Sequence, residues 1–163
     1  MNLLSRMIGY VPREERDGIR LEDKVPWRVN PTRDVGRFLR ALNLLVPDSS
    51  VAYFEDTGER HVAEYLQNVA IRPAVRVALG TIWPRPDCYH VALAATTAEE
   101  LADFLDRNPC GLLCVHLHVY RDRSVVLQWY DAFDDPIYIS RSVDEQAVSR
   151  FAGALGVPYG IGW

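Results

Sequence analysis

Two cysteines and three histidines are spaced so that they could bind a metal ion. They occupy alternate positions of expected strands, which would place them on one face of a sheet. The set is Cys88, His90, Cys114, His116 and His118. Thiolate and imidazole ligands suit zinc, so zinc is the cofactor that this face would take. We favour a simpler interpretation without a cofactor, in which the cysteines are buried as small apolar groups and the histidines form structural hydrogen bonds.

The same side chains could instead support thiol chemistry. Cys88 or Cys114 would be the nucleophile and His90 or His116 its base, with Tyr120 as a proton donor. The sequence contains no Gly-x-Ser-x-Gly elbow, no phosphate-binding glycine loop and no His-Glu-x-x-His pattern. A metal- or thiol-dependent enzyme is therefore an alternative, and no catalytic residue is assigned.

The densest acidic group of the chain follows the expected strand that ends near residue 129. It combines three carboxylates with two aromatic rings: Tyr130, Asp131, Phe133, Asp134 and Asp135. The carboxylates could bind Mg²⁺ or Ca²⁺, or meet the basic surface of another protein with the two rings as anchors. The structural interpretation is a solvated turn, because Asp and Asp-Pro favour turns. Among the functional interpretations we favour protein contact.

Composition narrows the class of protein. The 163 residues include 18 basic and 22 acidic side chains, which gives a net charge of −4. A chain of this length can bury roughly 70% of its unfolded surface as one domain, and its acidic balance disfavours a nucleic-acid partner. We therefore expect a non-catalytic protein-binding or inhibitory module that meets a basic partner. By analogy of size, charge and loop chemistry it is of the toxin-immunity type.

Two further binding modes stay open. Small side chains at Ala78, Gly80 and Ala92 would leave room over the polar sheet face for a flat molecule between His and Tyr rings, which predicts a small-ligand binding domain. A homodimer is also compatible with the sequence.

The sequence predicts a cytoplasmic protein without a membrane partner. Arg6 interrupts the apolar start of the chain and residues 13–17 are charged, so we expect no signal peptide. The chain lacks the run of about 18 apolar residues that a membrane helix needs. Three cysteines at irregular spacing favour a reducing compartment.

Helical periodicity predicts four helices. The first starts at Asn30-Pro31 and ends before Pro47, and the second covers residues 62–69. Capping boxes at Thr97/Glu100 and Ser142/Glu145 predict the other two, and Gly156 is the expected C-cap of the last.

A short apolar run predicts a buried strand over 51–54, and a further short strand is expected over 137–139. Alternating apolar residues predict two hairpins, one joining 75–79 to 89–93 and one joining 113–119 to 125–129, the second with a three-residue turn at 122–124. The fold class is therefore α+β, an antiparallel-rich sheet with helices on one face. Its inner βαββαβ order is ferredoxin-like, extended by a further hairpin strand and a C-terminal helix.

One domain is expected over residues 1–163. It consists of an irregular N-terminal arm (1–29), an α+β core (30–156) and a glycine-rich aromatic tail (157–163). We expect the tail to pack back on the domain rather than insert into a partner.

Overall fold

The computed structural model describes residue 11, residues 13–46 and residues 49–163. The strands in these ranges are β1 (Trp27–Val29), β2 (Ser50–Glu55), β3 (Cys88–Leu93), β4 (His116–Arg121), β5 (Ser124–Trp129), β6 (Ile137–Ile139) and β7 (Tyr159–Ile161). The helices are α2 (Arg13–Arg16), α3 (Val35–Ala41), the 3-10 turn η1 (Leu42–Leu44), α4 (Arg60–Val69), α5 (Ala95–Arg107) and α6 (Glu145–Leu155). Two features used in the sequence analysis lie outside the described residues. They are the apolar start of the chain with Arg6, and Pro47, before which the first predicted helix ends.

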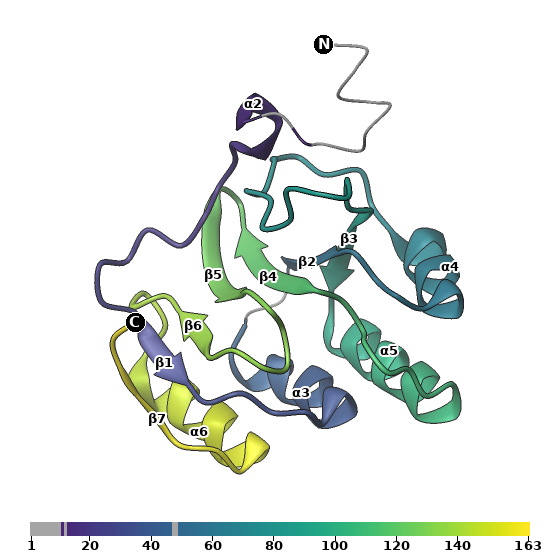
Figure 1. The fold of residues 1–163 in the computed structure, drawn as a ribbon. Helices are drawn as coiled ribbons and strands as arrows, with labels where there is room; N and C mark the ends of the chain where they lie inside the picture. Colours follow the sequence, from purple (N-terminus) through teal and green to yellow (C-terminus); the bar gives the residue numbers. More distant parts are fainter. Residues whose placement is uncertain (1–10, 12, 47–48) are drawn as a thin grey trace.

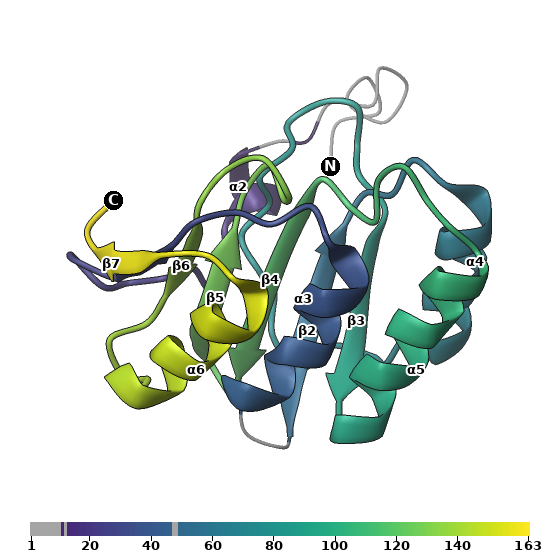
Figure 2. The ribbon, with the colours of Figure 1, turned by 90° about the horizontal axis from the view of Figure 1, so that it is seen from below.

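The described strands form a single sheet in the order β3-β2-β4-β5-β6-β1-β7 (Figure 1). Every neighbouring pair is antiparallel. Figure 2 shows α6, α3 and α5 side by side across one face of the sheet, with α4 beyond β3. The predicted α+β class is confirmed.

The helix-covered face of the sheet is an apolar core. Alternate strand residues such as Phe54, Leu117 and Trp129 point into it, because side chains alternate between the two faces of a strand. Phe38 of α3 is fully buried at the centre of this face. Its ring lies 4.8 Å from that of Trp129 and 6.0 Å from that of Phe151.

The predicted hairpin between 75–79 and 89–93 is wrong. Residues 75–79 form no strand, and Val77 makes only an isolated parallel bridge with Ile19. β3 pairs instead with β2, with Tyr53 opposite His90. The inner order from β2 to β5 is therefore β-α-β-α-β-β, and the ferredoxin-like order is not formed. Periodicity detected the apolar residues at 75–79 but carried no information about their partner.

The second hairpin is confirmed, but its register is reached by another route. Arg121 pairs with Ser124, so the turn has two residues and Asp122 adopts a positive φ of 54°. A bulge between Val119 and Tyr120 then shifts the register, and Leu117 lies opposite Trp129. The extra residue of a bulge restores the alignment of apolar rows that a three-residue turn would have provided.

The N-terminal arm and the first helix differ from expectation. Residues 27–29 are not irregular, because β1 pairs with β6 on one side and β7 on the other. The first predicted helix corresponds to α3, which begins at Val35, four residues after Pro31. The Asp34 side chain accepts a hydrogen bond there from the backbone N–H of Arg37. A side-chain acceptor at the N-cap satisfies a donor that a helix start otherwise leaves unpaired.

Both predicted capping boxes are misplaced. The N-cap of α5 is Ala94, so Thr97 lies inside the first turn. The N-cap of α6 is Asp144, two residues after Ser142, and its carboxylate accepts from the N–H of Ala147 at 2.9 Å. Gly156 is confirmed as the C-cap, with the left-handed φ of 73° that glycine adopts without strain.

The C-terminal tail packs back on the sheet, as expected. β7 pairs with β1, and the Trp163 indole N–H donates to the Lys24 carbonyl at 2.7 Å. The Trp163 ring lies 4.7 Å from that of Tyr138. The tail therefore closes the β1 end of the sheet.

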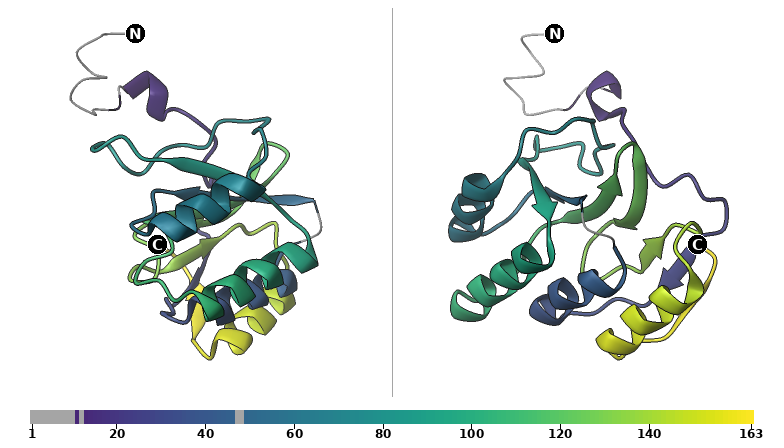
Figure 3. Two further views of the ribbon diagram at one scale, coloured as in Figure 1. Left: turned by 90° about the vertical axis from the view of Figure 1, so that its right-hand side faces the viewer. Right: turned by 180° about the vertical axis from the view of Figure 1, so that it is seen from behind.

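Two irregular segments cover the sheet face opposite the helices. Ile19 and Leu21 of the arm and Val75, Val77 and Leu79 pack there against the sheet. The Ile19 N–H bonds to the Arg76 carbonyl and the Ala78 N–H to the Ile19 carbonyl, which joins the two segments. Figure 3 shows α2 and the 70–87 segment on the side away from α3, α5 and α6.

Among the described residues, no helix has the length and apolar character needed to cross a membrane.

Candidate functional site

A buried carboxylate organises the polar part of this opposite face. Glu55, at the end of β2, is fully buried. It accepts hydrogen bonds from the backbone N–H groups of Gly80 at 3.0 Å and Thr81 at 2.5 Å. These bonds compensate the cost of removing a charged group from water, so Glu55 fixes the 80–81 backbone over the sheet.

A hydrogen-bonded chain continues from Glu55 to the edge of the sheet. The Tyr53 hydroxyl donates to the Glu55 carboxylate at 2.9 Å and lies 3.2 Å from the Cys88 sulfur. The Cys88 sulfur also lies 3.8 Å from the Pro86 carbonyl, so its single thiol proton is shared between that oxygen and the Tyr53 hydroxyl. Burial raises the pKa of Cys88 to about 11, so this sulfur is a thiol at neutral pH.

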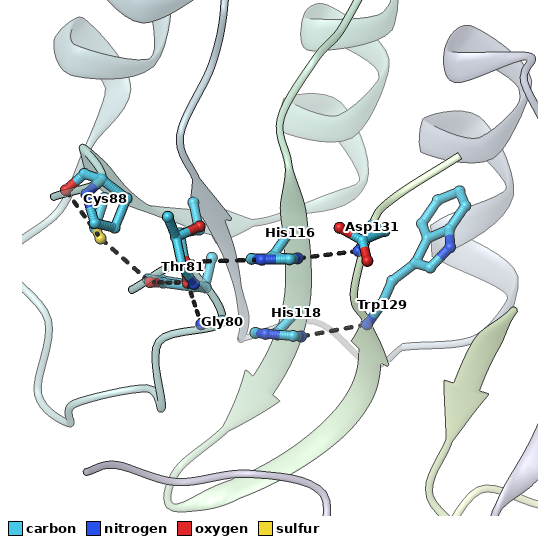
Figure 4. Close-up of polar contacts among 10 residues, drawn as sticks. Gly80, Thr81, Cys88, His116, His118, Trp129 and Asp131 are labelled. Atoms are coloured by element: carbon cyan, nitrogen blue, oxygen red, sulfur yellow. Dashed lines mark hydrogen bonds and ion pairs between the residues drawn. The ribbon is translucent and has the colours of Figure 1, made fainter. Parts of the chain in front are cut away.

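Figure 4 shows the parallel imidazoles of His116 and His118 on β4, between the 80–81 segment and the residues Trp129 and Asp131. His116 Nδ1 accepts from the Asp131 N–H at 3.0 Å, and His118 Nδ1 accepts from the Trp129 N–H at 3.3 Å. In both rings the proton therefore lies on Nε2. The Nε2 atom of His116 lies 4.0 Å from Oε1 of Glu55. Among the described residues, His118 Nε2 has no hydrogen-bond partner.

Burial keeps two of these histidines neutral. It lowers the pKa of His118 to about 3, with a further contribution from nearby His116. It lowers the pKa of His90 to about 4. His90 lies on β3, and its Nδ1 is 3.0 Å from the Tyr120 hydroxyl. Each imidazole is thus held by one structural hydrogen bond.

The five metal candidates do not share a site. Cys88, His90, His116 and His118 lie on the face opposite the helices, whereas Cys114 is fully buried in the helix-side core. The alternation that predicted a common face fails because β4 begins only at His116. No group of three or more His, Cys, Asp or Glu side chains within the described ranges is arranged to hold a metal ion.

The geometry does not favour thiol catalysis at these cysteines. Burial raises the pKa of Cys114 well above its usual value and also raises that of Cys88. Nucleophilic cysteines need the opposite shift, toward the thiolate. His90, which would act as the base, is hydrogen-bonded to Tyr120 rather than to a thiol.

The acidic loop, residues 130–135, has a buried Phe133 ring, a half-buried Tyr130 ring and exposed carboxylates. Phe133 is 8% exposed, and its ring is 4.6 Å from that of Trp129. Tyr130 makes edge contacts with the rings of His116 and His118 at 5.2 and 5.0 Å. Phe133 is therefore buried in this conformation instead of exposed to a partner, whereas Tyr130 is half-buried and its role as an anchor stays a prediction. The side chains of Asp131, Asp134 and Asp135 are exposed.

The backbone of the acidic loop is fixed from inside. The Asp131 N–H is bound by His116, and the Asp131 carbonyl accepts from the N–H groups of Asp134 and Asp135. The Trp129 indole donates to the Asp135 carbonyl at 2.6 Å. Positive φ angles at Asp131 and Phe133 turn the chain so that the rings and the carboxylates face opposite ways.

A hollow of about 280 Å³ lies beside this loop. Its wall includes Arg33, Leu112, Ala132 and Asp134. Arg33 pairs with Asp134 at 2.6 Å, with side chains 85% and 70% exposed. The hollow therefore offers apolar surface next to a carboxylate whose present counter-ion is solvated.

The small-ligand site predicted over Ala78, Gly80 and Ala92 is not formed as expected. A Cβ on Gly80 would lie 2.3 Å from the His116 ring, so the 80–81 backbone occupies that space. Ala78 is 5% exposed. Open space on this face lies instead nearer β3.

Sequence reasoning missed Glu55 and Tyr53. The predicted strand over 51–54 ends before Glu55, yet Glu55 continues the alternation that places Val51 and Tyr53 on one face. That alternation was a signal from which Glu55 could have been predicted. Its partners Gly80 and Thr81 are 25 and 26 residues away, and no sequence pattern indicated them.

No known protein family, curated protein or solved structure compared with this chain matches it.

Proposed function

We propose that the chain is a non-catalytic binding protein, of the inhibitory toxin-immunity type, whose acidic loop meets a basic surface of another protein. The observation that carries the proposal is the loop itself: Asp131, Asp134 and Asp135 present exposed carboxylates on a backbone fixed from within. A loop held in place before binding loses less conformational entropy when its partner docks.

The hollow beside the loop supports this proposal. The exposed Arg33–Asp134 pair contributes only about 0–1 kcal/mol, as surface ion pairs do. An arginine of the partner can therefore replace Arg33 at little cost, with its aliphatic stem against the exposed Leu112. The net charge of −4 accelerates encounter with a basic protein.

The raised pKa of Cys88 and the engaged histidines are the reasons to prefer binding over the enzyme alternative. The proposed compartment is the cytoplasm, because the three cysteines are unpaired.

The test compares three baits in affinity capture from cell extract, followed by mass spectrometry and calorimetry with the purified captured protein. They are the wild type, the loop variant Asp131→Asn/Asp134→Asn/Asp135→Asn, and a control with Glu64→Gln/Glu99→Gln/Glu100→Gln on α4 and α5. We expect a basic protein bound by wild type and control. The loop variant should bind it at least about tenfold more weakly and with less salt dependence.

Arg33→Ala sharpens the test, because it leaves Asp134 without its counter-ion and should tighten binding of the same partner. Equal affinity of the wild type and the loop variant would refute the proposal.

A further inference from the structure

A cleft distinct from the acidic loop lies on the sheet face opposite the helices. It is bounded by β2, β3 and the 76–85 segment and measures about 380 Å³. Metabolite and drug sites span about 300–1,000 Å³, so this volume fits a small molecule. The lining residues are Tyr53, Arg76, Val77, Leu79, Arg85, Cys88 and His90.

The His90 ring supplies a further polar group to this cleft. His90 is 8% exposed, and its Nδ1 lies 3.0 Å from the Tyr120 hydroxyl. The same ring lines the cleft. When Tyr120 donates to Nδ1, the ring proton lies on Nε2 and is available to an acceptor in the cleft.

The rim of the cleft carries positive charge. Arg76 and Arg85 are both exposed. Each guanidinium has five N–H donors, so an arginine that already interacts within the fold can also contact a ligand. The nearby carboxylate of Glu55 accepts from the 80–81 backbone and is fully buried. The cleft thus offers donors rather than a free acidic group.

Part of the cleft lining is apolar. Val77 and Leu79 both line it, and they pack together in the apolar cluster on this face. Their aliphatic side chains would contact the body of a ligand while its head group meets the arginines.

We propose that this cleft binds a small organic anion. Its carboxylate or phosphate contacts Arg76 and Arg85 and accepts a hydrogen bond from His90 Nε2, while its apolar or aromatic body lies against Val77 and Leu79. The site shares no residue with the acidic loop, so the two proposals stand or fall separately.

Four probes test the charge requirement on the full-length wild type. Benzoate and phenyl phosphate carry the two candidate head groups, benzamidine is a cation of similar shape, and benzyl alcohol is neutral. In ¹H–¹⁵N spectra we expect saturable shifts around Leu79 and His90 with an anionic probe. Benzamidine and benzyl alcohol should bind at least about tenfold more weakly than the anions, because the charge-assisted hydrogen bonds are lost. The stronger anion identifies the head group.

Variants locate the site. Arg76→Gln and Arg85→Gln should each weaken the better anion about tenfold, whereas Arg72→Gln, an exposed arginine outside the cleft, should not change its affinity. Thermal melting of each variant verifies that it is folded. A bound anion should also raise the pKa of His90, because it favours the imidazolium; this is read from the His90 ring resonances and needs no variant.

Three results would overturn the proposal. They are equal response to benzamidine and benzoate, equal loss of binding in Arg72→Gln and Arg76→Gln, and the absence of a saturable shift with either anion in the millimolar range.

Discussion

The helix-covered face of the sheet and the opposite face are both buried, but different interactions stabilise them. Phe38, Trp129 and Phe151 meet on the first through ring contacts alone. On the second, Glu55 and His116 are held by directed hydrogen bonds to backbone N–H groups. Apolar packing tolerates small shifts, whereas a buried polar group requires its partner in place.

The two faces of the sheet differ in what they contribute to stability and to the proposed binding sites. The apolar face attaches the helices and determines stability, because hydrophobic burial is the largest favourable term. The polar face fixes two irregular segments, the 76–85 loop and the acidic loop, which carry both proposed binding surfaces. Its hydrogen bonds therefore position these two segments in addition to stabilising the fold.

The largest expected effect comes from the apolar face. Phe38→Ala should lower the free energy of unfolding by about 3–5 kcal/mol, because it leaves a cavity between Trp129 and Phe151. Urea unfolding measures this loss. Leu44→Ala is the control, since Leu44 is 42% exposed and its removal should cost under about 1 kcal/mol. Similar losses in both variants would contradict the assigned core.

On the polar face, Glu55→Ala should cost about 2–4 kcal/mol, because the N–H groups of Gly80 and Thr81 and the Tyr53 hydroxyl lose a charged acceptor. Urea unfolding again measures the loss. Glu64→Ala removes an exposed ion pair with Arg60 and should cost under about 0.5 kcal/mol. A loss below about 1 kcal/mol for Glu55→Ala would show that the polar network is dispensable.

Gly80→Ala should cost about 1–3 kcal/mol, because the new methyl group would overlap the His116 ring. Gly153→Ala is the matched control on the exposed side of α6, where a Cβ meets nothing within 4 Å. It should raise stability by about 0.5–1 kcal/mol through helix propensity. Thermal melting distinguishes the two signs, and a stabilising Gly80→Ala would mean that the 80–81 segment is not packed on His116.

The smallest effect is a pH dependence. Burial holds the pKa of His118 at about 3, below its usual value of 6.5, so acidification protonates the unfolded chain first. Stability contributed by the neutral ring is complete above pH 6.5 and falls as the pH drops toward 3. Between pH 7.5 and 5.5 His118 accounts for a loss of about 1.4 kcal/mol, and His90, whose pKa burial lowers to about 4, adds a loss of similar size.

Urea unfolding at pH 7.5 and 5.5 measures this loss. His118→Gln should have a smaller difference between the two values, and the control His61→Gln, which changes a half-buried ring on α4, should keep the wild-type difference. An unchanged difference in His118→Gln would exclude this ring as the source.

Local patterns predicted the parts of the fold that depend on neighbours in sequence. The β4–β5 hairpin, the helix at 60–69 and the Gly156 cap follow from alternation, helical periodicity and backbone freedom. The predicted strand at 75–79 failed because its apolar residues pack beneath Ile19 and Leu21, a contact that no local pattern specifies.

The candidate sites were less predictable. Cys114 and His116 share a face in an extended strand, but the chain enters β4 only at His116, so the cysteine lies in the other core. The acidic loop was identified from composition, yet the positive φ angles of Asp131 and Phe133 turn its rings inward. Side-chain direction in a loop depends on backbone angles that residue types alone do not determine.

The sequence by itself determined the α+β class, the alternation that places Leu117 and Leu127 on the helix side, and the acidic loop, because periodicity and composition act over a few residues. Only the tertiary structure decided that Glu55 would be buried beneath Gly80 and Thr81, and that Arg76, Arg85 and His90 would line one cleft. These arrangements join segments distant in the chain, and their formation depends on how strands pair and loops cross the sheet. That pairing is a property of the whole fold, since each contact is favourable only when the others are already in place.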